Sequence, residues 1–456
     1  MHASRARQGM LVAVVVLAGL APPATARADT VTQWNQIATS ELVGVAGQGA
    51  VANVHLGMMH GAMYDAVNAI DRRYEPYVYA QRARPWYSQD AAAATAAYRV
   101  LVDSSPPLVP PAQQAALVAR VKPLYDAALA AIPDGAAKTG GVATGNAAAD
   151  AMIAARTGDG RFGPFRFTIA YGPGQWRPEP PDVRNDPGAW LKDVRTFLIE
   201  DGSQFASGPP NPLTSNRYTR EYNEVKTLGS LTSTVRTPDQ TAAGRFWGEA
   251  NGVGTWSALL RAIAEAHPAP IADQARLFAR VYLASADALI TVWNDKARYS
   301  FWRPINAIRH ADEDGNPATE ADPGWTPLVT TPPYPEHSSG LSAAGFAAAQ
   351  TLRSFYGTDE VTFGTTNIPT PPATPVARTF TSFSQAADEI VDARVWAGIH
   401  FRTADRAGAR IARRVVRYAD HRFFGRVNRG DHGDQRDDGD DDDHGDHDEG
   451  DDSAHP

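Results

Sequence analysis

The sequence predicts an all-α protein, a bundle of helices joined by long loops rich in proline and glycine. Apolar residues recur at the spacing of an α-helix through several long, alanine-rich stretches. No alternation of apolar and polar residues, the pattern of a β-strand, extends beyond four residues. The chain has no cysteine, so disulfides and thiolate metal sites are excluded and stability must come from core burial. Its 456 residues fit two or three average domains or one large helical domain.

The N-terminal residues 1–28 have the pattern of a secretory signal peptide. Arg5 and Arg7 precede an apolar stretch from Leu11 to Ala21, and a small-x-small cleavage site ends at Ala28. The apolar stretch is about half the ~20 residues that a membrane-spanning helix needs. We therefore expect a secreted or periplasmic protein without a stable membrane anchor, and an uncleaved anchor is the alternative.

Helical segments are predicted in the first third of the chain, before a long loop. Helical spacing covers residues 31–70, and alanine-rich stretches continue it, with proline-rich breaks, at residues 89–103, 111–131 and 141–156. Residues 157–215 differ, because glycine, proline and aromatic residues dominate them with little periodicity. Aromatic residues are too frequent there for a disordered linker, so we predict an ordered loop over one face of the bundle.

Helical spacing returns in the second half of the chain. Helices are predicted at about 238–266 and 270–297. The second of these brings Lys296 to its C-terminal end, and Pro304 prevents its continuation. A turn-rich loop at 311–336 follows.

Capping residues mark the last helices. Ser339 has the place of an N-cap before a helix of small residues that ends at Gly357. A loop rich in proline and threonine is predicted at 364–376. The sequence Ser-Phe-Ser-Gln at 382–385 has capping-box form and begins the next helix, and a basic helix over about 404–424 ends the fold.

The acidic charge of the chain is concentrated in its last residues, 430–456. This tail holds thirteen Asp or Glu and one Arg, against a net charge of −8 for the whole chain. The remainder is therefore close to neutral, which argues against nucleic acid as the main partner. The tail has almost no apolar residues and is predicted to be disordered, because it cannot offset its ordering entropy. The predicted organisation is a leader at 1–28, an all-α domain at 29–429 and this tail.

Three short stretches of the C-terminal half, at 296–304, 333–342 and 394–405, carry residues suited to one chemistry. They supply three cations, a serine hydroxyl, the amides of a helix start and one imidazole: Lys296, Arg303, Arg394, Ser339, Gly340 and His400. So much positive charge and so many donors at one point suit a tetrahedral or trigonal oxyanion.

Two of these stretches have further features of an oxyanion site. A Ser-Gly helix start aims a hydroxyl and backbone amides at one point, and Gly340 lets an anion approach the backbone. His400 follows a helix end between basic groups, so it is expected to be neutral. A neutral imidazole suits a nucleophile or a ligand of a metal atom.

The pattern Lys-x6-Arg-Pro, then Ser-Gly, then Arg-x5-His resembles the superfamily of vanadium-dependent haloperoxidases and type 2 phosphatidic acid phosphatases. The segments from His60 to Ile70, Trp176 to Pro181, Asp201 to Phe205 and Arg245 to Glu249 are similar to its secreted bacterial haloperoxidase-like branch. The resemblance covers roughly residues 31–425. It implies an all-α helical bundle of the vanadium haloperoxidase and acid phosphatase type, with the site between helices near its centre.

The resemblance also implies roles and an activity. The three cations would neutralise the oxygens of bound vanadate, or of phosphate in the same site, while Ser339 and the Gly340 amide donate hydrogen bonds. His400 would be the vanadium ligand or would attack phosphorus. The implied enzyme is a vanadate-dependent haloperoxidase that oxidises halide with hydrogen peroxide. The alternative is an acid phosphatase that hydrolyses phosphate esters through a phosphohistidine.

The sequence departs from the family after the Ser-Gly motif. The family usually has an acid–base histidine there, whereas this chain has Leu341, and loss of a general acid commonly costs on the order of 10²–10⁴ in rate. His337 is the candidate catalytic substitute, and its alternative role is a solvated pair with Glu336. Leu341 also leaves open a protein of another class, which binds phosphate or vanadate without catalysis.

A second departure follows the last histidine of the pattern. The family often has an acid four residues after His400, where this chain has Ala404 followed by Asp405. Asp405 is expected either to orient His400 or, as we favour, to cap the last helix. Halide preference, the organic substrate and assembly into a homo-oligomer are not determined by these patterns.

Overall fold

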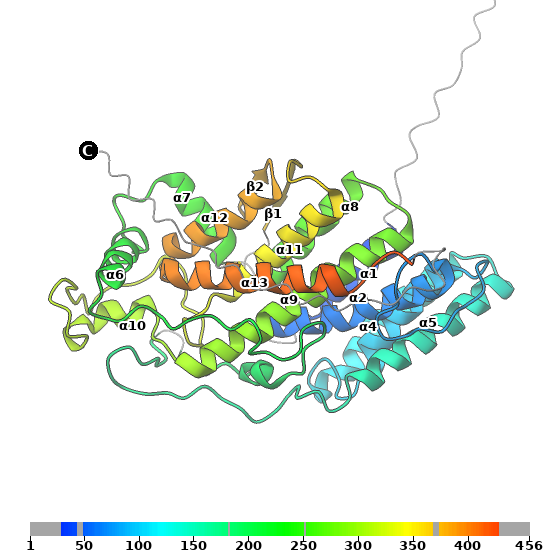
Figure 1. The fold of residues 1–456 in the computed structure, drawn as a ribbon, viewed down its shortest axis with the longest axis horizontal. Coiled ribbons are helices and arrows are strands. Elements are labelled where there is room, and N and C mark those ends of the chain that lie inside the picture. The colour runs from blue at the N-terminus through cyan, green and yellow to red at the C-terminus, as the bar shows by residue number, and fades with distance from the viewer. Residues whose placement is uncertain (1–28, 43–48, 181–182, 250–251, 368–373, 428–456) are drawn as a thin grey trace, which may run out of the picture.

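The computed structural model describes residues 29–42, 49–180, 183–249, 252–367 and 374–427. The predicted leader and acidic tail lie outside the described residues. In the described part, helices dominate and the sheet content is one pair of short strands (Figure 1). The prediction of an all-α fold is confirmed. None of the helices in these ranges combines the length and apolar character needed to cross a membrane.

The N-terminal part of the bundle is built around a buried helix, α2. Its helices are α1 (Thr30–Leu42), α2 (Gly49–Asp71), α3 (Gln89–Asp103), α4 (Pro111–Ala130) and α5 (Ala136–Ala155). The segment predicted as helical at 31–70 is thus two helices. Every residue of α2 from Ala50 to Ile70 is buried, because α3, α5 and α9 pack around it.

The predicted loop at 157–215 is ordered in its described part and includes one short 3-10 helix, η1 (Ala189–Asp193). A buried carboxylate of the bundle holds this loop: both oxygens of Asp287 accept hydrogen bonds from backbone N–H groups of residues 197–199, at 2.6–3.0 Å. Asp65 of α2 holds residues 77–79 in the same way, at 2.7–2.9 Å. The long loop is therefore fixed to the helices by buried hydrogen bonds.

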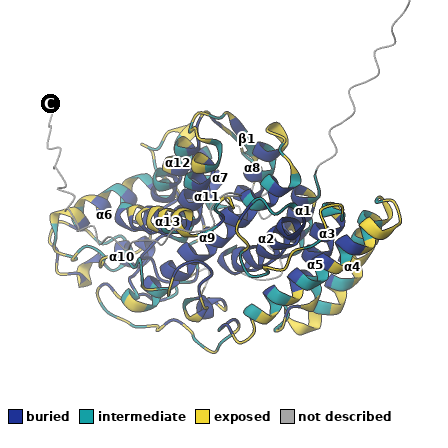
Figure 2. Ribbon diagram, turned by 45° about the vertical axis from the view of Figure 1, so that its right-hand side comes forward, coloured by how far each residue is buried: buried dark blue, intermediate teal, exposed yellow. Residues whose placement is uncertain are grey.

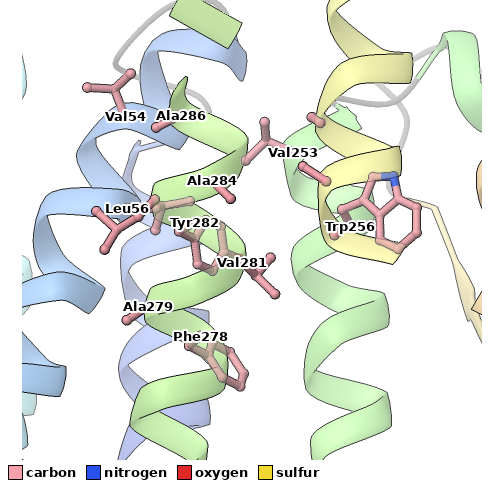
Figure 3. Close-up of a cluster of buried hydrophobic side chains, with 14 of the residues drawn as sticks. Val54, Leu56, Val253, Trp256, Phe278, Ala279, Val281, Tyr282, Ala284 and Ala286 are labelled. Atoms are coloured by element: carbon pink, nitrogen blue, oxygen red, sulfur yellow. The ribbon is translucent and has the colours of Figure 1, made fainter. Parts of the chain in front are cut away.

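The C-terminal part is built around α9. Its helices are α6 (Asn216–Leu228), α7 (Pro238–Gly248), α8 (Gly252–Ala266), α9 (Ile271–Tyr299), α10 (Pro304–Arg309), η2 (Ala311–Glu313), α11 (Gly340–Tyr356), α12 (Phe383–Trp396) and α13 (Arg402–Arg422). α9 packs against α2, α11 and α13. Figure 3 shows this core, with Leu56 of α2 next to Tyr282 of α9, and Val253 and Trp256 of α8 on the other side of that helix.

Several local predictions are wrong where the elements are short. The loop predicted at 364–376 overlaps β1 (Phe363–Thr366) and ends directly before β2 (Ala377–Phe380), with which β1 pairs in antiparallel orientation. Four-residue strands are too short to show alternation in the sequence. The segment predicted as one helix at 238–266 is α7 followed by α8.

The end of α9 also differs from the prediction. The helix ends at Tyr299, where Ser300 takes a left-handed conformation with φ of 40°. Pro304 was expected only to prevent continuation of this helix, but it is the first residue of α10. A proline fits there because the first residue of a helix needs no N–H partner. α6 and α10 were not predicted.

Candidate oxyanion site

Three segments that are far apart in the sequence meet beside the C-terminal end of α9. Lys296 lies in the last turn of α9, Glu336 in the loop before α11, and His400 in the turn between α12 and α13, and all three are buried. Gly398 makes that turn possible, because its φ is 79° and a Cβ atom there would lie 2.5 Å from the carbonyl oxygen of Gly229. The structure therefore brings together the three stretches that the sequence predicts to form one site.

The two ring nitrogens of His400 have different partners. Nε2 lies 3.0 Å from Nη1 of Arg303, and Nδ1 lies 2.9 Å from Oε1 of Glu336. A guanidinium only donates, so Nε2 accepts with its lone pair and the ring proton lies on Nδ1, which donates to Glu336. Burial, together with the cations of Arg303 and Arg394, holds the pKa of His400 well below its usual range. The imidazole is therefore neutral, with its Nε2 lone pair facing the cations.

Glu336 is the partner that fixes this histidine. Besides the bond to His400, Oε1 accepts from the backbone N–H of Phe401 at 2.9 Å. Burial raises the pKa of Glu336 to about 8, against the lowering effect of Arg303. The expected solvated pair of Glu336 and His337 is wrong, because both side chains are buried.

Asp405 has neither of the roles expected for it. Phe401 is the N-cap of α13 and no side chain caps it, while the position that would orient the histidine is taken by Glu336. Oδ1 of the buried Asp405 accepts from Oγ of Ser342 at 2.9 Å, and burial raises the pKa of Asp405 to about 7. The Ser339 hydroxyl is near enough to lower that pKa, but the two side chains do not meet in hydrogen-bonding geometry.

Lys296 uses its ammonium protons to hold the loop before α11. Nζ donates to the carbonyl oxygens of Pro335, Glu336 and Ser338, at 2.8, 2.9 and 2.6 Å. Burial and the neighbouring Arg303 hold the pKa of Lys296 well below its usual range, and Arg394 acts in the same direction. Lys296 thus fixes the loop that presents the carboxylate to the histidine, and in this arrangement it donates no N–H elsewhere.

Three buried donors of the cluster lack a hydrogen-bond partner in the described part of the chain: Nη2 of Arg303, Nε of Arg394 and Oγ of Ser339. Other nitrogens of these guanidiniums hold the structure, since Arg303 Nε donates to the carbonyl of Tyr334 at 2.9 Å and Arg394 Nη1 to that of Trp247 at 3.1 Å. Buried polar groups are normally paired. Unpaired donors on neighbouring cations therefore fit an acceptor-rich ligand such as a tetrahedral oxyanion.

A cavity of about 290 Å³ lies beside this cluster. Arg394, one of the clustered cations, lines the cavity together with Gly340. Trp247 and Trp293 form aromatic parts of its wall. Leu341 also lines the cavity, at the position where the resemblance places an acid–base histidine. The described lining residues include no Asp, Glu, His or Lys, so their titratable groups are arginine and tyrosine.

Comparison with protein families and curated proteins agrees with this geometry. A family model described as the VCPO second helical-bundle domain matches residues 276–428, the segment that holds the cation cluster. Vanadium chloroperoxidase of Curvularia inaequalis is 31% identical to the chain over 197 residues, which are 36% of this chain and 32% of that protein. The chain therefore matches about a third of the length of this relative.

Solved structures share the fold over most of the chain. The first bacterial vanadium-dependent iodoperoxidase matches 88% of this chain and 98% of its own, with a TM-score of 0.74 and 21% identity. A holo-type bacterial vanadium-dependent chloroperoxidase matches 84% of this chain and 93% of its own, with a TM-score of 0.64 and 16% identity. The chain therefore has the fold of the vanadium haloperoxidases, and its residues 276–428 are similar to the second helical-bundle domain of that family.

The placement of His337 bears on its expected role in proton transfer. Its Nε2 lies 3.0 Å from both Oγ of Ser207 and the carbonyl oxygen of Gly208, and its ring lies edge-on to Tyr299. Burial lowers the pKa of His337 to about 4. It is not among the described residues that line the cavity. The side chain is thus held against the loop at 207–208.

Sequence reasoning found the cations and the histidine of this candidate site but missed two residues that organise them. Glu336 fixes the tautomer of His400, as described above. The ring of Tyr334 lies 5.1 Å from Nζ of Lys296 and 4.9 Å from Cζ of Arg303, so its face stabilises two buried cations. Both residues lie in the second of the three stretches, directly before the Ser-Gly helix start.

Proposed function

We propose that this chain is a vanadate-dependent haloperoxidase that oxidises halide with hydrogen peroxide. The observation that carries the proposal is the set of unpaired buried donors on Arg303, Arg394 and Ser339 around the neutral imidazole of His400. The choice of vanadate and halide rests on relatives described as a vanadium chloroperoxidase and a vanadium-dependent iodoperoxidase.

The donor set fits a vanadate ion. Arg303 and Arg394 would each give an unpaired N–H to an anion oxygen, and Ser339 would give its hydroxyl. Gly340 begins α11, so its amide has no partner within the helix and is available to the same anion. Nε2 of His400 would be the vanadium ligand. Bound vanadate would supply a Lewis-acid centre that activates hydrogen peroxide towards halide.

Neighbouring residues of the chain orient His400 and fix the position of its ring proton. Because Nδ1 donates to Glu336, the ring proton stays away from Nε2 and the lone pair stays available. Arg303 Nη1 now donates to that lone pair and would turn to the anion instead. Lys296 keeps the loop of Glu336 in place through three carbonyl oxygens.

The cavity gives halide an access route with suitable walls. Trp247, Trp293 and Leu341 give apolar patches to a lining that is otherwise mostly polar, and such patches suit small organic molecules. Arg394 lines the same cavity and supplies positive charge at its inner end, where the cluster lies.

Leu341 favours a second candidate function, binding of phosphate or vanadate without turnover. The described cavity lining has no carboxyl, imidazole or ammonium group that could transfer a proton to a reactant. The same feature disfavours an acid phosphatase, because an alkoxide leaving group needs a proton. The arrangement of His400 as a neutral nucleophile is the remaining support for phosphatase action.

The deciding experiment is halide oxidation by the purified protein, with and without orthovanadate, using a dye that is brominated on turnover. A haloperoxidase brominates the dye only when vanadate and hydrogen peroxide are both present, and Arg394→Ala abolishes the reaction. Arg353→Ala, which removes an exposed arginine of α11 outside the site, is the matched control and keeps the activity.

The other outcomes identify the alternatives. Tight vanadate binding with neither bromination nor hydrolysis of p-nitrophenyl phosphate would establish the binding protein. Hydrolysis of that ester with inhibition by vanadate, and without bromination, would establish the phosphatase, and either result would overturn the haloperoxidase.

A further inference from the structure

A row of arginines covers the outward side of α13. The helix exposes five arginines at positions spaced by four, three, one and three residues: Arg406, Arg410, Arg413, Arg414 and Arg417. This spacing places them on one face of an α-helix. Figure 2 shows that side of α13 in the colour of exposed residues. We call these five residues the arginine face.

The arginine face is not neutralised by ion pairs in the described part of the chain. None of its members forms an ion pair there, whereas Arg402, at the start of the same helix, pairs with both Glu224 and Asp392. Burial and neighbouring guanidiniums, including those of Arg217 and Arg414, lower the pKa of Arg410. The face is therefore a concentration of mutually repelling positive charge.

The surface next to the arginine face is hollowed. A groove of about 460 Å³ lies between α12 and α13, and Arg406, Arg410 and Arg413 line it. Asp388 and Asp392 of α12 line it as well. Asp392 is already paired with Arg402, so Asp388 alone faces three guanidiniums and the groove stays positive overall. It offers an extended acidic segment a place beside the helix.

The acidic tail of the chain has the charge and the reach to cover this face. It carries thirteen acidic residues and one arginine over 430–456 and begins shortly after α13 ends at Arg422. Fully extended, it would span roughly 90 Å at about 3.3 Å per residue. α13 is about 30 Å long at 1.5 Å per residue. Covalent attachment gives the tail a high effective concentration at the helix that it follows.

We propose that the acidic tail folds back onto the arginine face of the same molecule. Its carboxylates approach the exposed guanidiniums as charge-assisted pairs, many at once, without a fixed register. This role goes beyond the proposed haloperoxidase activity and does not depend on it, because the arginine face is separate from the cation cluster at His400. Since the pairs are exposed, salt weakens them strongly.

The absence of cysteine in the chain allows a direct test. Gly445→Cys adds one thiol near the middle of the tail without changing its charge, and a nitroxide on it reports mobility by electron paramagnetic resonance. In the full-length protein at low salt we expect a partly immobilised spectrum. The label becomes mobile in about 1 M NaCl, where the Debye length is about 3 Å.

Two triple variants separate the arginine face from general positive charge. Arg410→Gln with Arg413→Gln and Arg414→Gln should free the label at low salt to the mobility seen at high salt. Arg82→Gln with Arg84→Gln and Arg298→Gln removes the same charge from exposed positions elsewhere and should leave the label immobilised.

Three results would overturn the proposal. A label that is fully mobile at low salt in the wild-type background would show that the tail does not dock. Equal release by both triple variants would show that only the net charge of the domain matters. Immobilisation that grows with protein concentration would assign the arginine face to the tail of a second copy.

Discussion

Two buried charges on α9, Asp287 and Lys296, hold loops by opposite means. The Asp287 carboxylate accepts from the backbone N–H groups of residues 197–199, at 2.6–3.0 Å. The Lys296 ammonium donates to backbone carbonyl oxygens within residues 335–338, at 2.6–2.9 Å. Each side chain pins one loop to the same helix with three hydrogen bonds, although the two charges differ in sign.

Asp287 and Lys296 differ in the charges that surround them. Burial raises the pKa of Asp287 to about 6, but Arg156 is nearby and both carboxylate oxygens are hydrogen-bonded. Lys296 lies instead among like charges, those of Arg303 and Arg394, where donors are left unpaired. A buried charge alone therefore marks structure, whereas clustered like charges with unpaired donors mark a ligand site.

The largest effect is expected from breaking the cluster without touching the loop anchors. Arg394→Ala removes a buried donor and a cation, so the affinity for inorganic phosphate should fall by about 4 kcal/mol, roughly 1000-fold. Equilibrium dialysis with labelled phosphate measures this change. Arg353→Ala should bind phosphate like the wild type, and an equal affinity in both variants would show that the cluster is not the anion site.

The pH dependence of the unfolding free energy tests the structural role of Asp287. The raised pKa of Asp287, about 6 against 3.8 in the unfolded chain, means that the folded chain binds more protons in this window. The contribution of Asp287 is thus present at low pH and lost as the pH rises. We expect the unfolding free energy of the wild type relative to Asp287→Asn to fall by about 3 kcal/mol between about pH 3 and pH 7. A difference that stays constant in denaturant titrations would contradict this expectation.

Ligand binding should stabilise the protein through the cluster alone. At a concentration 100 times its Kd, orthovanadate should raise the unfolding free energy by about 2.7 kcal/mol. Chemical denaturation should show this increment in the wild type and in Asp287→Asn, because Asp287 does not belong to the cation cluster. Arg394→Ala should lose the increment. An unchanged increment in that variant would show that vanadate does not bind at the cation cluster.

The smallest effect is expected from replacing the group that orients His400. In Glu336→Gln the amide oxygen can still accept from Nδ1 and from the backbone of Phe401, so the loop is kept while the ability of the side chain to ionise is lost. We expect vanadate affinity about 10-fold below the wild type, as for other partners that orient a metal-ligating histidine. Glu360→Gln, at an exposed position, is the control. Full affinity in Glu336→Gln would assign Glu336 a purely structural role.

The long helices could be predicted because their signals are local. Ser382 accepts from the amide of Gln385 as its capping sequence predicts, and Gly357 follows α11 with φ of 70°. The strands β1 and β2 and the six-residue α10 could not be predicted in the same way. Elements this short are stabilised by contacts with distant parts of the chain, which no local pattern contains.

The candidate site was predictable where residue type and spacing suffice. The cations and His400 follow from their motifs, and the structure places them in one cluster. The bond between Glu336 and His400 joins residues 64 positions apart, so the sequence alone did not show it. Asp405, much nearer in sequence, was the more obvious candidate and bonds Ser342 instead. The choice between these two acids is made by tertiary packing.

The central claim, that this cation cluster is an oxyanion site, is tested most directly by calorimetric titration of the protein with orthovanadate at neutral pH. The account predicts binding of one equivalent, competition by phosphate, and loss of the binding heat in both Arg303→Ala and Arg394→Ala. Binding that survives in both variants, or no binding to the wild type, would contradict it.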